Sequence, residues 1–253
     1  MQNWGLEGQI ALVTGASKGI GRGCALELAK AGCSVALGLH SVSRDNGLVD
    51  EIQALGVEAL PLQLDVQSKS EIDTGVQQAI KRFGRIDILV NNAGGGRIGL
   101  ATDVTEEDFD FIVDANFKGT FFVSQAVGRH MIRQKSGRVV NIGSQAGATA
   151  LRTESVYCAA KAAVAHLTKC LAVEWGEYGV RVNCVAPTFI RTPGTEAALS
   201  DPEFSRYVTE EKIVLGRVGE IADVTGAVMF LCSEASSLVT GATLLVDGGW
   251  TIH

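Results

Sequence analysis

Residues 10–31 read IALVTGASKGIGRGCALELAKA. The short apolar run Ile10–Val13 is typical of a buried strand, and Gly21–Ala31 has the length and patterning of a helix. The glycines between them permit a tight turn and a close backbone approach, while the N-terminus of a helix presents free N–H groups to a phosphate. The spacing G-x-x-x-G-x-G differs from the general dinucleotide fingerprint G-x-G-x-x-G. By itself, the stretch therefore predicts either a phosphate-binding turn or a plain strand-to-helix connection.

Short apolar runs alternate with segments of helical length along the whole chain. The runs expected to be strands are Ile10–Val13, Val35–Leu39, Ala59–Leu64, Ile86–Val90, Val139–Ile142, Val182–Ala186 and Thr243–Val246. The clearest helical segments are Gly21–Ala31, Ser70–Phe83 and Ser155–Trp175. Nearly continuous apolar strands that alternate with helices indicate a parallel sheet covered on both faces. We therefore expect an α/β protein with a single-domain doubly wound (Rossmann) fold over residues 1–253 and a seven-stranded parallel sheet.

One long stretch, residues 188–219, shows no clear period and contains Pro193, Gly194 and Pro202. A long irregular segment in a compact domain is usually functional, and often it is a lid. We expect this stretch to be a substrate flap, and refer to it below as the flap.

Composition argues against several classes of function and indicates the compartment. The 253 residues include 22 basic and 28 acidic side chains, a net charge of −6, which gives no general reason to bind nucleic acid. Six scattered cysteines without a C-x-x-C pair favour small buried side chains over a disulfide framework or a metal site. The N-terminal residues lack the pattern of a signal peptide, and no apolar run reaches the ~18 residues of a membrane span. We expect a cytoplasmic protein without a membrane partner.

Three further motifs follow predicted strands. Asn91-Asn92-Ala93-Gly94 follows the fourth strand, Ser144 follows the fifth, and Tyr157-Cys158-Ala159-Ala160-Lys161 opens the long helix after it. A Y-x-x-x-K element alone occurs by chance, but here it stands thirteen residues after Ser144 and downstream of the other motifs in the same order. With the glycine turn, these motifs resemble the short-chain dehydrogenase/reductase family over essentially the whole chain.

The spacing of Tyr157 and Lys161 has a chemical reason. Residues four apart share one face of a helix. A free tyrosine has a pKa of about 10, and a neighbouring cation together with an oxidised nicotinamide ring would lower this pKa. Tyr157 could then take the proton of a substrate alcohol while hydride leaves the same carbon, and return it in the reduction.

The resemblance implies roles for further residues. It implies that Ser144 hydrogen-bonds the substrate oxygen, that Lys161 also reaches the nicotinamide ribose, and that Asn116 supports a water relay, so that hydride transfer needs no metal. It also implies that Thr192 and backbone groups nearby hold the carboxamide, although Thr188 replaces the usual glycine of that segment. The catalytic set is Asn116, Ser144, Tyr157 and Lys161. The expected cofactor-binding set is Gly15, Ser17, Lys18, Gly19, Ile20, Gly21, His40, Ser41, Asp65, Val66, Asn92, Ala93, Gly94, Tyr157, Lys161, Pro187, Ile190 and Thr192.

The end of the second strand bears on the choice of cofactor. In NAD-dependent dinucleotide folds an acidic side chain about 20 residues past the glycine turn binds the ribose 2′-hydroxyl. Leu39 stands there, while Lys18 and Arg44 are basic candidates for a 2′-phosphate, and His40 and Ser41 could add hydrogen bonds. NADP is therefore the favoured cofactor and NAD the alternative. Lys18 and Arg44 could also be ordinary surface charges.

The sequence predicts an NAD(P)-dependent oxidoreductase that interconverts a secondary alcohol and a ketone. We favour a polyol, sugar or sugar acid as the small-molecule substrate, with a 3-oxoacyl thioester as the alternative. A non-catalytic dinucleotide-binding sensor or scaffold is a further possibility from another class. The resemblance also implies a homotetramer, since members of the family are commonly tetramers.

Overall fold

A seven-stranded parallel sheet forms the centre of the computed structural model, which describes residues 4–252 apart from the side chain of Arg44. The strands are β1 Ile10–Thr14, β2 Ser34–Leu39, β3 Ala59–Gln63, β4 Ile88–Asn91, β5 Gly137–Ile142, β6 Val180–Pro187 and β7 Thr243–Val246. Their order is β3-β2-β1-β4-β5-β6-β7, and every neighbouring pair is parallel. The order reverses between β1 and β4, which is where ligands bind in open sheets of this kind. The predicted fold class is confirmed.

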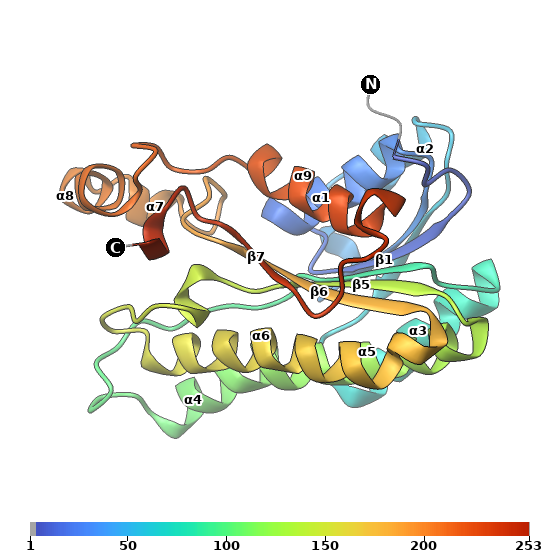
Figure 1. Cartoon of the computed structure of the whole chain (residues 1–253), viewed down its shortest axis with the longest axis horizontal. Helices are drawn as coiled ribbons and strands as arrows, with labels where there is room; N and C mark the ends of the chain where they lie inside the picture. Colours follow the sequence, from blue (N-terminus) through green and yellow to red (C-terminus); the bar gives the residue numbers. More distant parts are fainter. Residues whose placement is uncertain (1–3, 253) are drawn as a thin grey trace.

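Helices cover both faces of this sheet (Figure 1). One face carries α1, α2 and α9, and the other carries α3, α4, α5 and α6. The helices are α1 Gly19–Lys30, α2 Leu48–Gln53, α3 Lys69–Phe83, α4 Glu106–Val113, α5 Gly119–Gln134, α6 Ser155–Trp175, α7 Glu196–Leu199, α8 Pro202–Arg206 and α9 Ile221–Cys232. Shorter turns are η1 Val42–Arg44, η2 Asp114–Lys118, η3 Gln145–Gly147, η4 Gly176–Tyr178, η5 Tyr207–Lys212, η6 Glu234–Ser236 and η7 Trp250–Ile252, of which η2 and η5 are π-helical. Two separate apolar clusters fill the spaces above and below the sheet.

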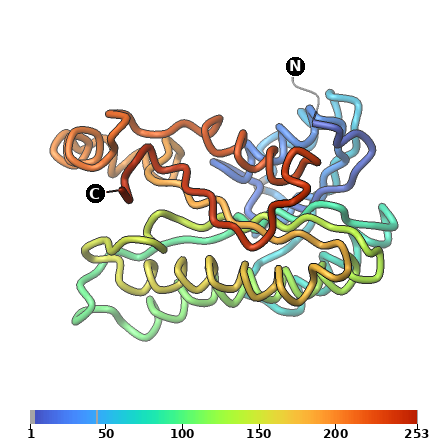
Figure 2. The backbone as a smooth tube through the Cα atoms, viewed as in Figure 1, coloured from blue at the N-terminus to red at the C-terminus, as the bar shows by residue number. Residues whose placement is uncertain are grey.

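The flap is more regular than the sequence suggests, because it contains α7, α8 and η5. The Asp201 carboxylate accepts hydrogen bonds from the N–H groups of Glu203 and Phe204, and this cap, with Pro202 in the first turn, starts α8. Figure 2 shows the flap beside the last residues of the chain, and the N–H of Leu215 donates to the carbonyl of Gly248 at 3.1 Å. The Asp201 cap and the hydrogen bond from Leu215 to Gly248 thus order the flap, although its sequence shows no periodic pattern of apolar residues.

A chain of buried amides and hydroxyls ties the sheet to α5 and α6. Asn91 Nδ2 on β4 donates to Ser124 Oγ at 2.8 Å and to Asn141 Oδ1 at 2.9 Å. Asn141 Nδ2 on β5 donates to Thr168 Oγ1 at 2.9 Å, and that hydroxyl donates to the carbonyl of Val164. Buried polar groups require hydrogen-bond partners, so this series of side-chain hydrogen bonds fixes how α6 lies on β5.

Helix α6 and the turn after it, Ser155–Tyr178, are long and apolar enough to cross a membrane by length and composition alone. Here Leu171, Ala172 and Trp175 of this helix are buried in the apolar cluster on one face of the sheet. Core helices of globular proteins meet the same criterion, and α6 packs as one of them in this structure.

Replacing Asn141 with leucine, which has a similar volume, should lower the free energy of unfolding by about 1–3 kcal/mol, because two buried hydrogen bonds are lost at once. Urea denaturation followed by circular dichroism measures the loss. Gln53→Leu, at an exposed position on α2, is the control and should change stability by less than about 0.5 kcal/mol. Equal midpoints for the two variants would contradict the structural role of this chain of polar groups.

Candidate active site

Two cavities meet at the carboxyl edge of the sheet, one of about 380 Å³ and one of about 430 Å³. Five residues line both: Ile20, Asn92, Gly94, Thr192 and Gly194. The first cavity extends along the glycine turn toward the ends of β2 and β3, and the second extends toward α6 and the flap. Together they form one cleft at the point where the strand order reverses.

The predicted residues divide between the two cavities. The first is lined by Gly15, Ser17, Lys18, Gly19, Ile20, His40, Ser41, Asp65, Val66, Asn92, Ala93, Gly94 and Thr192. The second is lined by Ile20, Asn92, Gly94, Asn116, Ser144, Tyr157, Lys161, Pro187, Ile190 and Thr192. Of the predicted set, Gly21 lines neither cavity. It is buried in the first turn of α1, and its role is one of packing.

The glycine turn is tied to the end of β4. Thr14 Oγ1 accepts hydrogen bonds from the N–H groups of Asn92 and Ala93 at 3.0 and 3.1 Å. Asn92 Nδ2 donates to the carbonyls of Thr14 and Gly15, each at 3.1 Å. A Cβ atom on Gly21 would overlap both Asn92 Nδ2 and the Gly15 carbonyl, so only glycine lets α1 start this close to β4.

The same turn fits a dinucleotide phosphate. Gly15 and Gly19 have φ of 64° and 58°, a region that favours glycine. Lys18 precedes α1, and its side chain makes no capping bond to the first turn. The first amides of α1 are therefore not capped from this position and face a cavity with the positive end of the helix dipole.

The residues predicted to be catalytic lie around the second cavity. Ser144 precedes η3, where its Oγ donates to Gln145 Oε1 at 2.7 Å and accepts from the N–H of Ala146 at 3.1 Å. Tyr157 lies in the first turn of α6 and Lys161 one turn later. Lys161 Nζ is buried, donates to the carbonyl of Ile142 at 2.9 Å, and lies 5.6 Å from the centre of the Tyr157 ring.

Asn116 reaches this group from the π-helical turn η2. Its Nδ2 donates to the carbonyls of Gly95 at 2.6 Å and Ile112 at 2.8 Å, while its buried Oδ1 has no hydrogen-bond partner within the described residues. A Cβ atom on Gly94 would lie 2.5 Å from that Oδ1 and 3.7 Å from Lys161 Nζ, so both side chains converge on Gly94. Turns of this kind inside helices occur frequently at functional sites.

Burial dominates the electrostatics of the site. It raises the pKa of Tyr157 to about 12, against a lowering effect of the Ser144 side chain and a further rise caused by the charge of Glu154. Burial also lowers the pKa of Lys161 to about 8. The lowered tyrosine pKa expected from the sequence is thus not produced by these side chains, because Lys161 is directed at the Ile142 carbonyl and its own charge is disfavoured.

Sequence reasoning missed other side chains that line the second cavity, among them Arg97, Gln145, Glu154 and Phe189. Glu154 could have been found, because it stands only three residues before Tyr157 at the start of the long helix. The other three come from loops and the flap, where no periodic pattern signals orientation. Thr188, which departs from the family pattern, also lines this cavity, and its buried hydroxyl has no partner within the described residues.

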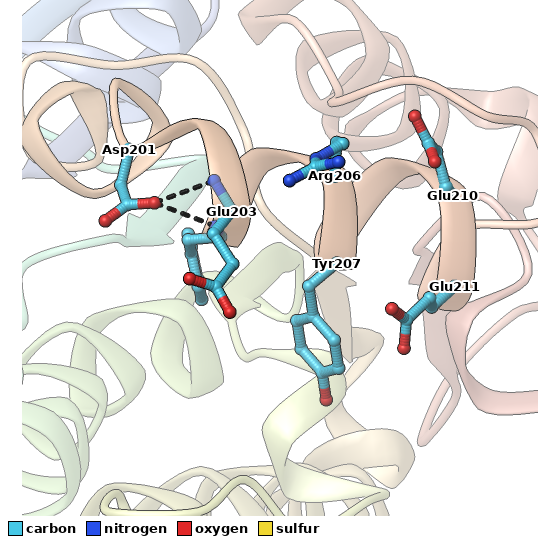
Figure 3. Close-up of a pocket in the computed structure, with 7 residues that line it drawn as sticks. Asp201, Glu203, Arg206, Tyr207, Glu210 and Glu211 are labelled. Carbon is cyan, nitrogen blue, oxygen red and sulfur yellow. Dashed lines mark hydrogen bonds between the residues drawn. The ribbon is translucent and has the colours of Figure 1, made fainter.

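A separate hollow of about 600 Å³ lies on α8 and η5 (Figure 3). The residues that line it are Asp201, Glu203, Phe204, Arg206, Tyr207, Glu210 and Glu211, and none of them lines the cleft. Figure 3 shows Arg206 and Glu210 on one side of these helices and Glu203, Tyr207 and Glu211 on the other. Between residues 4 and 252 no group of three or more His, Cys, Asp or Glu side chains is arranged to hold a metal ion.

Comparisons with known proteins agree with this geometry. A family model described as enoyl-(acyl carrier protein) reductase matches residues 15–251. The 3-oxoacyl-[acyl-carrier-protein] reductase FabG of Thermotoga maritima is 40% identical over 247 residues, which cover 98% of this chain and 99% of the reductase. A gluconate 5-dehydrogenase from Burkholderia cenocepacia, solved with NADP and tartrate, has a TM-score of 0.94 and 35% identity over 98% of this chain and 96% of its own. A 7α-hydroxysteroid dehydrogenase, solved with NADH and 7-oxo glycochenodeoxycholic acid, has a TM-score of 0.92 and 35% identity over 98% and 96%.

The raised pKa of Tyr157 can be measured directly. In the protein alone, the side chain should remain a phenol through pH 10, because burial disfavours the phenolate. Carbon-13 NMR of protein labelled at tyrosine Cζ follows the ionisation, and the signal absent from Tyr157→Phe identifies the residue. Tyr178 and Tyr207 are partly exposed and remain in both samples as references. A half-transition of the Tyr157 signal at or below pH 10 would refute the expectation.

Proposed function

The chain belongs to the short-chain dehydrogenase/reductase family and is an oxidoreductase of CH–OH groups, and from that premise we propose that Tyr157 is the acid and base of its reaction. The supporting observation is that Tyr157, Ser144, Lys161 and Asn116 line one cavity, which joins the cleft along the glycine turn. This arrangement serves the interconversion of a secondary alcohol and a ketone.

The protein's own groups manage the proton and the oxygen of the substrate. In the oxidation, Tyr157 takes the hydroxyl proton as the C–H bond of the same carbon breaks, and in the reduction it returns that proton to the oxygen. The Ser144 hydroxyl donates to the substrate oxygen and stabilises its developing negative charge. When bound, the nicotinamide cofactor supplies or accepts the hydride.

Lys161 and Asn116 support this proton transfer. Burial lowers the pKa of Lys161 to about 8, and its charged form favours an anionic Tyr157. The unpartnered Oδ1 of Asn116 is an acceptor that a water molecule could satisfy beside Lys161. A relay of the proton from Tyr157 through Lys161 toward solvent follows from these positions.

The lining of the second cavity favours a hydroxylated substrate over a thioester. Arg97, Gln145 and Glu154 bring polar groups to it, while Leu151 and Phe189 supply apolar surface. A polyol, sugar or sugar acid can satisfy several such polar groups at once, as the similarity to a gluconate 5-dehydrogenase also suggests. A 3-oxoacyl thioester is the second candidate, favoured by the 40% identity to FabG. A sensor without catalysis is disfavoured because Tyr157 and Lys161 both line the cavity.

NADP is the proposed cofactor. Lys18 immediately precedes α1 and lines the first cavity with His40 and Ser41, while Leu39 at the end of β2 is fully buried and offers no acceptor to a ribose hydroxyl. Asn46 Nδ2 donates to the carbonyl of Ser17 at 3.3 Å, which holds the segment after β2 against the turn. The side chain of Arg44 lies outside what the structure describes. Solved relatives hold either NADP or NADH, so the argument depends on Lys18.

We further propose a homotetramer in the cytoplasm. Exposed apolar side chains on α6 (Val173) and on the edge strand β7 (Leu244 and Leu245) are surfaces that symmetric association would bury. The six cysteines are all free, which fits a reducing compartment. We also propose that residues 1–253 form a single domain and that the flap covers the substrate.

Tyr157→Phe should lower kcat by at least ~10²-fold, because the variant has no proton to give or take at the substrate oxygen. Binding of the cofactor, measured by NADPH fluorescence, should remain close to the wild-type value. Tyr178→Phe, at a partly exposed position outside the cleft, is the matched control and should leave kcat unchanged. A Tyr157→Phe enzyme that keeps most of its activity would rule out the assignment.

Lys18→Ala should reduce the preference for NADP(H) over NAD(H) by about 10- to 100-fold, which is the effect of one charge-assisted bond to a phosphate. The measurement is kcat/KM for both cofactors with one substrate, in wild type and variant. Lys30→Ala removes a lysine from the other end of the same helix and should leave the ratio unchanged. A wild-type enzyme that favours NAD(H), or a ratio that is insensitive to Lys18, would count against the proposal.

A further inference from the structure

Glu154 occupies a position that the reaction as described does not use. It directly precedes α6 and lines the catalytic cavity, but its carboxylate does not cap the helix. Among the described residues this carboxylate has neither a hydrogen bond nor an ion pair, whereas its backbone N–H and C=O are both bonded within the chain. This carboxylate is therefore free to accept a hydrogen bond from a ligand in the cavity.

The carboxylate lies close to the reacting position. Glu154 is the N-cap residue of α6, three residues before Tyr157, and both residues line the same cavity. The negative charge of Glu154 also raises the pKa of the Tyr157 phenol, although burial is the larger cause. Burial raises the pKa of Glu154 itself, as expected for a carboxylate partly removed from water.

The other charged groups of the cavity do not neutralise Glu154. Arg97 lies on the loop after β4, where its guanidinium stacks over the Phe111 ring at 4.7 Å and lies 3.6 Å from Asp108. Lys161 is bound to the Ile142 carbonyl. Leu151 and Phe189, which also line the cavity, offer no donor side chain.

The side of the Tyr157 ring is also open. A Cβ atom on Gly96 would lie 3.7 Å from Tyr157 Cδ2, in ordinary contact, so glycine at this position leaves space beside the ring. This space beside the ring is open to a substituent of a bound ligand.

We propose that Glu154 accepts a hydrogen bond from a second hydroxyl of the substrate, on a carbon adjacent to the one that reacts, and thereby selects vicinal diols and hydroxyketones. The inference rests on the proposed function of the cleft and specifies its substrate class. It assigns to Glu154 a role in specificity, since the residue binds the part of the substrate that does not react. A site that holds a substrate hydroxyl with a charged acceptor discriminates strongly against the analogue that lacks it.

The test compares two alcohols that differ by one hydroxyl, cis-cyclohexane-1,2-diol and cyclohexanol. With saturating NADP⁺, the wild-type enzyme should show a kcat/KM at least about tenfold higher for the diol, and Glu154→Ala should lower this ratio by at least about tenfold. Glu154→Gln keeps an acceptor without the charge and should lie between the two. Glu174→Ala removes an exposed carboxylate near the other end of α6 and should keep the wild-type ratio.

Two results would overturn the inference. One is an equal loss with both alcohols in Glu154→Ala, which would mean that the residue supports the fold or the chemistry without recognising a hydroxyl. The other is a stronger Glu154-dependent preference for 2-aminocyclohexanol than for the diol, which would mean that the carboxylate selects a cation.

A measurement of diol binding tests this inference independently of the proposed reaction. Calorimetric titration of the diol into the NADP⁺-loaded protein should give a dissociation constant that rises at least about tenfold in Glu154→Ala. If the protein binds the diol through Glu154 but oxidises neither alcohol, the proposed reaction fails and the inference holds. If it oxidises both with a ratio that Glu154→Ala leaves unchanged, the reaction holds and the inference fails.

Discussion

The site depends on the hydrogen bonds that join the turn after β1 to the end of β4. Thr14 and Asn92 each bond to the backbone of the other strand end, and Gly21 lets α1 begin against them. These two strands are paired in the sheet and flank the place where its order reverses, so the bonds extend their pairing to the turns beyond the strand ends. They hold the glycine turn against the segment that leads to Gly94. The two cavities share Asn92 and Gly94, and therefore meet at this junction.

Hydrogen bonds from the sheet position helix α6, which carries Tyr157 and Lys161. The buried chain from Asn91 through Asn141 to Thr168 sets the position of the helix on the sheet. The bond from Lys161 to the Ile142 carbonyl fixes the lysine against the same strand, two residues before Ser144. The proposed base Tyr157, its neighbour Lys161 and the hydroxyl of Ser144 are therefore held by β5 and one helix. In the proposed function, the flap is left to recognise the rest of the substrate.

Much of this architecture could be predicted from the sequence. Continuous apolar runs specified the strands to within a few residues, because a strand buried on both faces has few alternatives, and the motif order specified the fold class and the family. The helices of the flap could not be predicted, since the Asp201 cap is local but the packing of Phe189 and Phe204 on Trp250 involves distant residues. The lowered pKa of Tyr157 expected with an oxidised nicotinamide bound stays a prediction, whereas in the protein alone burial raises this pKa. Spacing along a helix says that Lys161 is near Tyr157 but not that its ammonium group turns toward Ile142. Gly21 as a cofactor contact stays a prediction, and the structure adds that a side chain there would overlap Asn92 and the Gly15 carbonyl.

Aromatic side chains of the flap pack around Trp250, and this contact can be followed by tryptophan fluorescence. Trp250 is buried between the Phe189 and Tyr207 rings, with ring centres 5.5 and 6.3 Å away, and Phe189 also lines the catalytic cavity. The chain contains three tryptophans, so the emission of this indole can be isolated by replacing Trp4 and Trp175. Indole emission responds to the polarity and packing around the ring. The protein thus carries a built-in fluorophore whose signal reports how the flap packs against the end of the chain.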